Sequence, residues 1–333
     1  MNPKVSILIP IYKTSDYIEK CAESLFNQTF KDIEYIFVND ATPDDSIEKL
    51  LKVIGKYKER EKQIKIIHHS SNRGLAVARN TALDASTGSF IAVVDSDDFI
   101  EPRMIEDLFS KAISENADIV VCDFIMEYPG EIKRSRDYIS ENKEENIKNI
   151  IQHELISSSL VNKLVSRNLY LRQDCRVPEN LNYCEDWHVM TRLFYFATKI
   201  VKVDQAYYHY IKYNLNSITK GINKNHFKNI ITFWSQLDSF LKVNNEFEKY
   251  KIIMELPKVQ SKVHLIIDTH SYLLRKEYAD IFREEEKHCI SQLTKGEQLM
   301  LFLVRYKLFL PAQMFHDYQV LKNYFVRKLS FVK

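Results

Sequence analysis

Three aspartates follow directly on a short apolar run of the sequence. Residues 90–94 form the run, and Asp95, Asp97 and Asp98 come after it, with Ser96 inside the group. Such a β-branched and aromatic run is typical of a buried parallel strand, and open α/β sheets bind ligands at the carboxyl ends of these strands. Like charges this close favour a compensating cation, and carboxylates suit Mg²⁺ or Mn²⁺. The sequence therefore predicts a divalent-metal site, with capping of the following turn or helix as the alternative.

Two further groups of polar residues stand where expected elements begin or end. Pro10 and Tyr12 end the first strand, where a flat base can lie, and Asp40 ends the second, where it can accept a hydrogen bond from a base N–H. The alternative for Asp40 is a turn cap ahead of the proline at position 43. Arg79 and the arginine at position 73 flank a helix start whose free N–H groups favour an anion. Either arginine can instead make a surface ion pair.

The elements that position these residues alternate along the chain. Strands are expected over residues 5–11, 33–38, 64–68, 90–94 and 119–124. Helices are expected over residues 16–28, 44–60, 74–85 and 102–115. This alternation with short connections predicts a mainly parallel, doubly wound α/β sheet. Residues 128–145 are polar and predict a surface excursion, after which helices are expected over 146–153 and 187–198, with an apolar run at 200–203 and a tyrosine-rich segment at 207–210.

Composition limits the classes of function. With 333 residues and 45% hydrophobic content, the chain can bury a substantial core. A net charge of +2 gives no argument for nucleic acid as a partner. The five cysteines include no C-x-x-C pair, which argues against a disulfide framework and favours the cytoplasm. Six scattered glycines form no phosphate-binding loop, so any phosphate charge needs a metal and basic side chains.

Several of these segments resemble one enzyme family. Residues 5–12, 37–40, 72–80 and 94–98 occur in the order and spacing of the inverting family 2 glycosyltransferases. Residues 162–164, 185–187 and 217–219 resemble acceptor-half motifs of the branch that builds bacterial polysaccharides and capsules. The resemblance covers roughly residues 3–220 and implies a GT-A fold, a Rossmann-like, mainly parallel sheet flanked by helices. The implied divisions are a nucleotide-binding half (1–125) and an acceptor half (126–222) of the domain 1–222, and a helical C-terminal appendage (223–333).

The resemblance also implies roles on the donor side. Pro10, Tyr12 and Asp40 would hold the nucleobase, usually uracil, and Arg79 is the better anion ligand of the two arginines. Asp95 and Ser96 would contact the donor, Asp97 would bind the Mn²⁺ or Mg²⁺ that bridges its diphosphate, and Asp98 would support the loop or the sugar. The chain departs from the family where Asn39 replaces a frequent second acid, Ala41 a frequent glycine and Lys13 a common asparagine.

Asp186 is the residue expected to act as the catalytic base. An inverting transfer needs one base to take the proton of the acceptor hydroxyl, and Glu185 and Trp187 would lie beside it on the acceptor side. The alternative is that the two acids only favour the helix dipole. Lys212 and Ser217 would hold the diphosphate, and the lysine at position 163 would assist them. His209 would be a further metal ligand, with a packed core histidine as the alternative.

Together with this resemblance, the sequence predicts a metal-dependent, inverting glycosyltransferase. The enzyme would move a sugar from a nucleoside diphosphate, expected to be UDP, onto a hydroxyl of a glycan or lipid-linked saccharide. Residues 301–333 hold six basic residues against one acid among large apolar residues, a pattern that suits a helix lying on an anionic membrane at the inner face of the plasma membrane. Intramolecular packing of these residues is the alternative. The competing functions are a non-catalytic nucleotide- or glycan-binding scaffold and a Mg²⁺-dependent phosphohydrolase.

Overall fold

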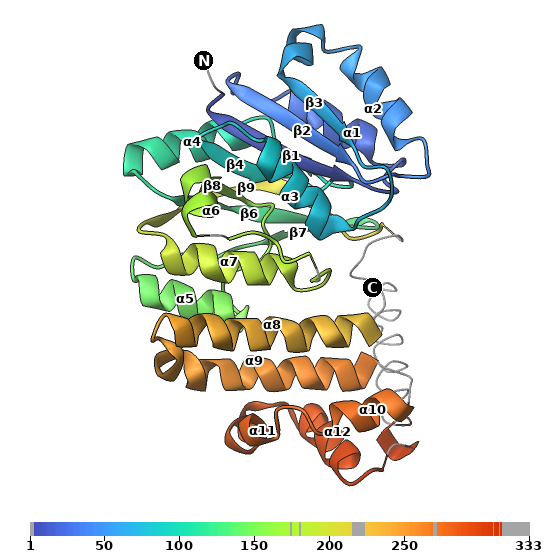
Figure 1. Ribbon diagram of the computed structural model, residues 1–333, viewed down its shortest axis with the longest axis vertical. Coiled ribbons are helices and arrows are strands. Elements are labelled where there is room, and N and C mark those ends of the chain that lie inside the picture. Colours follow the sequence, from blue (N-terminus) through green and yellow to red (C-terminus); the bar gives the residue numbers. More distant parts are fainter. Residues whose placement is uncertain are drawn as a thin grey trace. The chain divides into compact units, whose positions relative to one another are not determined.

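The chain divides into two compact units, residues 1–217 and 218–333. The computed structural model describes residues 3–173, 175–179, 181–214, 224–268, 272–308, 310–312 and 314. The first unit contains the sheet and the second is helical (Figure 1). The unit boundary falls among residues outside that description, and the expected division at residue 222 stays a prediction.

Four parallel strands open the first unit and alternate with helices. The strands are β1 Val5–Ile11, β2 Ile33–Asn39, β3 Ile64–His68 and β4 Phe90–Val93, in the order β3-β2-β1-β4. The helices between them are α1 Ile18–Phe26, α2 Ser46–Ile54 and α3 Leu75–Ala85. All of β1 is buried, as expected for a central strand covered on both faces. The α/β alternation that the sequence predicted is confirmed.

Helix α2 is shorter than the sequence predicted. A helix was expected to residue 60, but α2 ends at Ile54 and Lys58–Gln63 forms a 3₁₀ segment. Within this segment Arg60 is buried and donates to the carbonyls of Phe26 and Gln28 at 3.2 and 2.7 Å. These contacts hold the segment against the end of α1, so tertiary hydrogen bonds replace the last turns of the expected helix.

The second half of the sheet is mixed. Its elements are β5 Phe99–Ile100, α4 Met104–Glu115, β6 Ile119–Tyr128, β7 Glu131–Ser135, α5 Lys143–Gln152, β8 Lys163–Ser166, α6 Arg167–Gln173, α7 Glu185–Phe196 and β9 Ile200–Ile211. Strand β8 lies antiparallel between β4 and β6, and β9 runs parallel to β6 and antiparallel to β5. The parallel pairing expected from the sequence therefore describes β1–β4 best. The short strands β5 and β8 run against their neighbours.

The segment 128–145 is more ordered than a surface excursion. Strand β7 pairs with the end of β6 in a hairpin whose turn contains Gly130 at φ +76°, a value that favours glycine. All residues of β7 are exposed, so the strand has no apolar face that its sequence could reveal. Asp137, just beyond it, is buried. The segment is thus anchored in the protein interior.

The second unit is built from helices, as the sequence predicted. They are α8 Lys224–Val243, α9 Phe247–Asp268, α10 Tyr272–Tyr278, α11 Arg283–Cys289 and α12 Lys295–Arg305. Helices α8 and α9 pack side by side, with Trp234 buried, and α10, α11 and α12 each contact α9 (Figure 1). Within the part of the chain that is described, no helix has both the length and the apolar character needed to cross a membrane.

Candidate active site

Strand β9 holds the acidic turn that follows β4. The Tyr208 hydroxyl donates to Asp98 Oδ2 at 2.8 Å and accepts from the Asp95 amide at 3.1 Å. The Ile211 amide donates to Asp98 Oδ1 at 2.8 Å. Burial, together with the charges of Asp97 and Asp95, raises the pKa of Asp98 well above its usual range. These are the contacts of a carboxyl group that supports the turn from the inside.

Asp97 lines a pocket of about 300 Å³ beside this turn. The Asn214 side chain donates to Asp97 Oδ2 at 2.7 Å, and burial followed by the charge of Asp95 raises the pKa of Asp97. The pocket is lined by Asp16, Tyr17, Lys20, Asp97, Asp98, Phe99, Ile211 and Tyr213. Among the described residues, no three acidic, histidine or cysteine side chains converge as a complete metal site. Asp95 and Asp97 still fit a hard divalent ion that draws its remaining oxygens from a phosphate or from water.

A single arginine joins acidic residues from three places in the sequence. Arg79, on α3, donates to Asp95 Oδ1 at 3.0 Å, to Glu185 Oε1 at 3.1 Å and to Asp186 Oδ1. The guanidinium is almost completely buried, and the charges of the three carboxylates outweigh burial and raise the pKa of Arg79. Arg79 therefore connects the acidic turn after β4 with the first turn of α7. These contacts are ion pairs, as in the alternative given for Arg79, although they are buried and not at the surface. A contact of Arg79 with the donor stays a prediction.

Asp186 is held from two sides at the start of α7. Arg79 donates to its Oδ1, and the amide of Leu160, in the loop before β8, donates to its Oδ2 at 3.3 Å. Burial raises the pKa of Asp186, while the positive charge of Arg79 opposes this shift. The pKa of Glu185 is also raised, by burial and by the charge of Asp186. The site thus contains an oriented carboxylate whose ionised form is favoured chiefly by Arg79, with the Leu160 amide and the charge of Lys163 acting in the same direction.

Asp40 is bound by three donors of the chain itself. Its Oδ1 accepts from the amide of Arg73 at 2.8 Å and lies 2.7 Å from His69 Nδ1, and its Oδ2 accepts from the Gly74 amide at 2.8 Å. Gly74 has φ +90° and precedes α3, so these bonds fix a turn that needs glycine. The anion that the sequence predicted at this helix start is therefore the carboxylate of Asp40. A hydrogen bond from a nucleobase to Asp40 stays a prediction.

Half of the chain matches a known family. The family model named Glycosyl transferase family 2 matches residues 6–172. The Bacillus subtilis protein EpsH, which is named a glycosyltransferase, is 32% identical over 257 residues, or 75% of this chain and 72% of EpsH. The chain belongs to glycosyl transferase family 2. EpsJ of the same organism is 33% identical over 227 residues, or 66% of this chain and 64% of EpsJ. The protein is therefore an enzyme, a glycosyltransferase.

Solved structures show the same fold. The S. aureus TarS 1–349 structure in complex with UDP-GlcNAc aligns with a TM-score of 0.72 at 18% identity, covering 94% of this chain and 90% of that chain. At this identity the likeness concerns the fold alone. The GT-A fold with a helical C-terminal region, which the sequence predicted, is confirmed.

In this family 2 glycosyltransferase, the residues expected at the nucleobase lie at strand ends. Pro10 is a buried residue of β1 that pairs with β2, and Tyr12 directly follows β1 with 40% of its surface exposed. Ser96 is buried within the turn between Asp95 and Asp97. Tyr12 is thus the exposed flat ring of this group, and the donor contacts of all three residues stay predictions.

Other expected ligands have different surroundings. His209 lies between two carboxylates, with Nδ1 2.7 Å from Glu127 Oε1 and Nε2 2.8 Å from Glu101 Oε1, and its ring stacks on Phe99. Both ring nitrogens are occupied, so these contacts do not support a metal ligand and favour the packed histidine instead. The Lys212 ammonium lies 4.0 Å from the centre of the Tyr210 ring, and burial lowers its pKa.

Two expected residues make hydrogen bonds within the first unit. Trp187 Nε1 donates to the Ile150 carbonyl at 2.8 Å, which ties α7 to α5. Lys163 is fully buried and hydrogen-bonded within the protein, so its expected help in holding the diphosphate is wrong for this arrangement. Ser217 lies outside the described residues.

Three contributors were missed by the sequence reasoning. Tyr208 and Asn214 bind the acidic turn, and Leu160 contributes only its backbone amide to Asp186. The tyrosine-rich segment 207–210 was a visible signal for Tyr208, because the hydroxyl of a buried tyrosine needs a partner. A backbone donor such as that of Leu160 leaves no signal in the sequence.

Proposed function

We propose that this enzyme is a metal-dependent, inverting glycosyltransferase that uses a nucleoside diphosphate sugar. The observation that carries the proposal is the Arg79 contact set, which brings Asp95, at the end of β4, and Asp186, at the start of α7, to one guanidinium. A donor-side acid and a candidate base thus belong to the same site. A transfer with inversion needs this pairing of functions on one reacting centre.

In the proposed reaction, Asp186 removes the proton of an acceptor hydroxyl. The acceptor oxygen forms a bond to the anomeric carbon, the bond from that carbon to the diphosphate oxygen breaks, and the nucleoside diphosphate leaves with the electron pair. Asp186 must be ionised to do this, and Arg79 favours that form against the effect of burial. Its Oδ1 accepts from Arg79 and its Oδ2 from the Leu160 amide, and each carboxylate oxygen has two lone pairs, so a lone pair remains for the proton.

Asp95 and Asp97 are the residues that would hold a divalent ion. When bound, Mg²⁺ or Mn²⁺ would act as a Lewis acid that stabilises the negative charge of the leaving diphosphate. Asn214 fixes one oxygen of Asp97 and Tyr208 fixes the Asp95 backbone, so both carboxylates have supported positions. This support is a reason to place the metal here rather than at His209.

UDP is the first nucleotide to test. The exposed ring of Tyr12 and the carboxylate of Asp40 lie at the ends of neighbouring strands, as a base-binding pair would. Both UDP and UDP-GlcNAc occur in structures of TarS, which shares the fold. We infer that a UDP-sugar, with N-acetylglucosamine among the first sugars to try, is the donor.

A membrane-borne glycan or lipid-linked saccharide is the proposed acceptor. On α12, Leu299 and Phe302 are exposed, and Tyr306 follows on the same helical face, with a spacing of three and then four residues. Lys307 adds a positive charge next to them. An apolar face beside basic residues suits contact with an anionic membrane surface, which would bring the enzyme to such an acceptor.

The decisive experiment measures transfer and donor binding separately. Sugar release and transfer from UDP-sugars with Mn²⁺ should be lost in Asp186→Asn by about 10²- to 10⁴-fold, while UDP binding with Mn²⁺ is retained. Asp97→Ala should lose metal-dependent UDP binding. Unchanged turnover in Asp186→Asn would refute the assignment of Asp186 as the base. Cleavage of phosphomonoesters would indicate the phosphohydrolase, and UDP binding without any turnover of donors would indicate the scaffold.

A further inference from the structure

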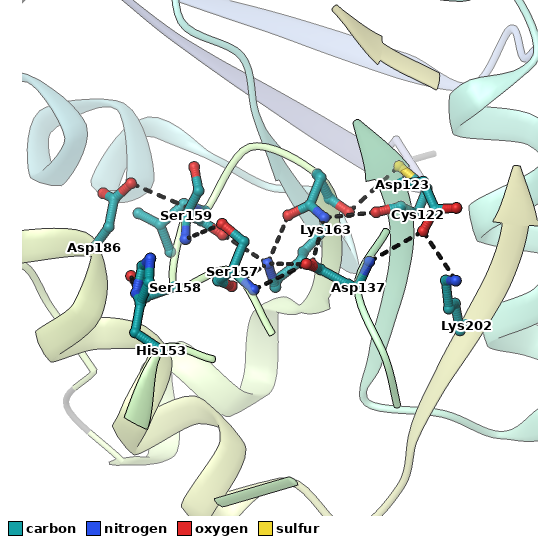
Figure 2. Close-up of polar contacts among 12 residues, drawn as sticks. Cys122, Asp123, Asp137, His153, Ser157, Ser158, Ser159, Lys163, Asp186 and Lys202 are labelled. Carbon is teal, nitrogen blue, oxygen red and sulfur yellow. Dashed lines mark hydrogen bonds and ion pairs between the residues drawn. The ribbon is translucent and has the colours of Figure 1, made fainter. Parts of the chain in front are cut away.

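A buried lysine organises the loop that contacts the proposed base. The Lys163 ammonium donates to the carbonyls of Ser157 and Ser159, both at 2.8 Å, and to Asn162 Oδ1 at 2.6 Å. Figure 2 shows these contacts converging from the loop onto the ammonium. The nearest carboxylate oxygen, Asp137 Oδ2, is 3.7 Å away. Lys163 therefore acts chiefly as a cross-link between loop carbonyls, and Asp137 is a more distant counter-ion.

The loop 157–160 has no regular secondary structure and is held from several directions. The Ser157 amide donates to Asp137 Oδ1 at 2.9 Å, and Ser158 Oγ lies 2.9 Å from His153 Nδ1. The next residue but one, Leu160, donates its amide to Asp186 Oδ2. Lys163 binds the carbonyls on both sides of Ser158, so it fixes the path of the backbone that leads to this donor (Figure 2).

The outer end of this network is fixed in the sheet. The Asp137 amide donates to Asp123 Oδ1 at 3.2 Å, and Asp123, on β6, pairs with Lys202 of β9 at 2.9 Å. Asn162 donates to Asp137 Oδ2 at 2.9 Å and to the Cys122 carbonyl at 2.6 Å. Figure 2 shows the network reaching from Lys202 to Asp186. The loop is thus anchored on rigid strands, which is what a positioned catalytic group requires.

We propose that Lys163 is a positioning residue for Asp186: it fixes the 157–160 loop so that the Leu160 amide orients the carboxylate. This inference rests on the proposed role of Asp186 as the base. A purely stabilising role is the competing explanation. Replacing a buried charge and its partner by apolar groups is often neutral for stability, so stability alone gives no reason to expect a buried ammonium at this place.

The test compares two buried lysines. Lys163→Met removes the ammonium from the loop, and Lys262→Met is the matched control in the other unit. Lys262 is also buried, donates to the Ala279 carbonyl at 2.9 Å and pairs with Glu286 at 2.6 Å, and Glu286 keeps Arg305 as a second partner. Lys163→Met takes the lysine donor from the Ser157 and Ser159 carbonyls and from Asn162 Oδ1, while Asp137 keeps the donors of Ser157 and Asn162. Lys262→Met takes it from one carbonyl and leaves Glu286 with Arg305. Each substitution removes a buried ammonium, so a loss of Tm is expected from both.

The expected result separates positioning from stability. Lys163→Met should lower kcat by about 10- to 100-fold, because a displacement of about 1 Å at a reacting group has this effect. The donor KM and the affinity for UDP in the presence of Mn²⁺ should stay within about twofold of wild type. Hydrogen exchange at the Leu160 amide should accelerate in Lys163→Met and not in Lys262→Met. Wild-type kcat in Lys163→Met, or an unchanged Leu160 exchange rate, would overturn the proposal.

Two further variants keep the test decisive. If Lys163→Met does not fold, Asp137→Asn loosens the same network more gently, because an asparagine oxygen can still accept from the Ser157 amide. A smaller fall in kcat in the same direction supports the proposal, and an unchanged kcat overturns it. An inactive Asp186→Asn with a fully active Lys163→Met would refute only the positioning role, whereas an active Asp186→Asn would refute the base itself.

Discussion

The Arg79→Met substitution tests whether one guanidinium keeps the acidic site folded and ionised. Arg79 contacts Asp95 at 3.0 Å and Glu185 at 3.1 Å, and it also donates to Asp186. With an effective dielectric constant of about 20, each contact contributes roughly 5 kcal/mol of gross attraction, most of which offsets desolvation. Removing one partner of such a buried set typically lowers the free energy of unfolding by about 3 to 5 kcal/mol. We expect a loss of this size near neutral pH.

The loss should depend on pH in a defined direction. Burial already raises the pKa values of Glu185 and Asp186 above those of the unfolded chain, and losing Arg79 raises them further. The folded variant then binds more protons than the unfolded chain, so its stability falls as pH rises through the raised pKa values. Urea unfolding should show a larger deficit against wild type at about pH 8 than at about pH 5.5. The acid limb of the transfer rate should also move to higher pH.

Arg60→Met is the control for this experiment. Arg60 is equally buried, but it donates to the carbonyls of Phe26 and Gln28 rather than to carboxylates. Its loss should destabilise the protein by a similar amount at both pH values, because none of these partners titrates. If Arg79→Met and Arg60→Met show the same pH-independent deficit, or if Arg79→Met turns over like wild type at neutral pH, the electrostatic account of the site is wrong.

Two further substitutions test the fold around the acidic turn. Gly88→Ala places a Cβ 2.7 Å from the Ser6 amide nitrogen, so it should lower the free energy of unfolding by about 1 to 3 kcal/mol. Urea titrations measure this change. An unchanged free energy of unfolding would mean that β1 and the start of β4 are less rigid than described. Asp98→Asn can keep the hydrogen bonds to Tyr208 and Ile211 while removing a negative charge that is buried beside two others. In metal-free buffer the Tm of this variant should therefore rise, and it should rise more at about pH 8 than at about pH 5. A fall in Tm would contradict the argument from charge repulsion.

The sequence was most informative where local pattern and strand geometry agree. The apolar run 90–94 and the three aspartates after it predicted a ligand-binding strand end, and β4 ends at Val93 with the acidic turn directly after it. Asp186 was likewise expected at the start of a helix and lies in the first turn of α7. Both predictions needed only the period of the hydrophobic pattern and the capping preferences of acidic residues.

The contacts that the sequence could not indicate join distant segments. Arg79 was expected to bind an anion, with an ion pair as the alternative, but its partners Glu185 and Asp186 lie more than 100 residues away, and no local pattern indicates that pairing. Lys163 resembled a free cation in the sequence because two of its three hydrogen-bond acceptors are backbone carbonyls, which are chemically alike at every position. Long-range packing decides such roles, so composition and spacing could identify the residues of the site but not their partners.

The balance of charge in the site leads to a final prediction about metal and donor. Arg79 can offset only one of the three carboxylates it contacts, and Asp97 adds another acid beside them. A nucleoside diphosphate is itself an anion, so its binding next to Asp95 and Asp97 should need a divalent cation to offset the repulsion. In thermal-shift titrations, Mn²⁺ should raise the Tm, UDP alone should not, and the two together should exceed Mn²⁺ alone because each stabilises only the folded state. Tight UDP binding in the presence of a chelator would show that other cationic groups, with Lys212 the first to examine, carry the diphosphate instead.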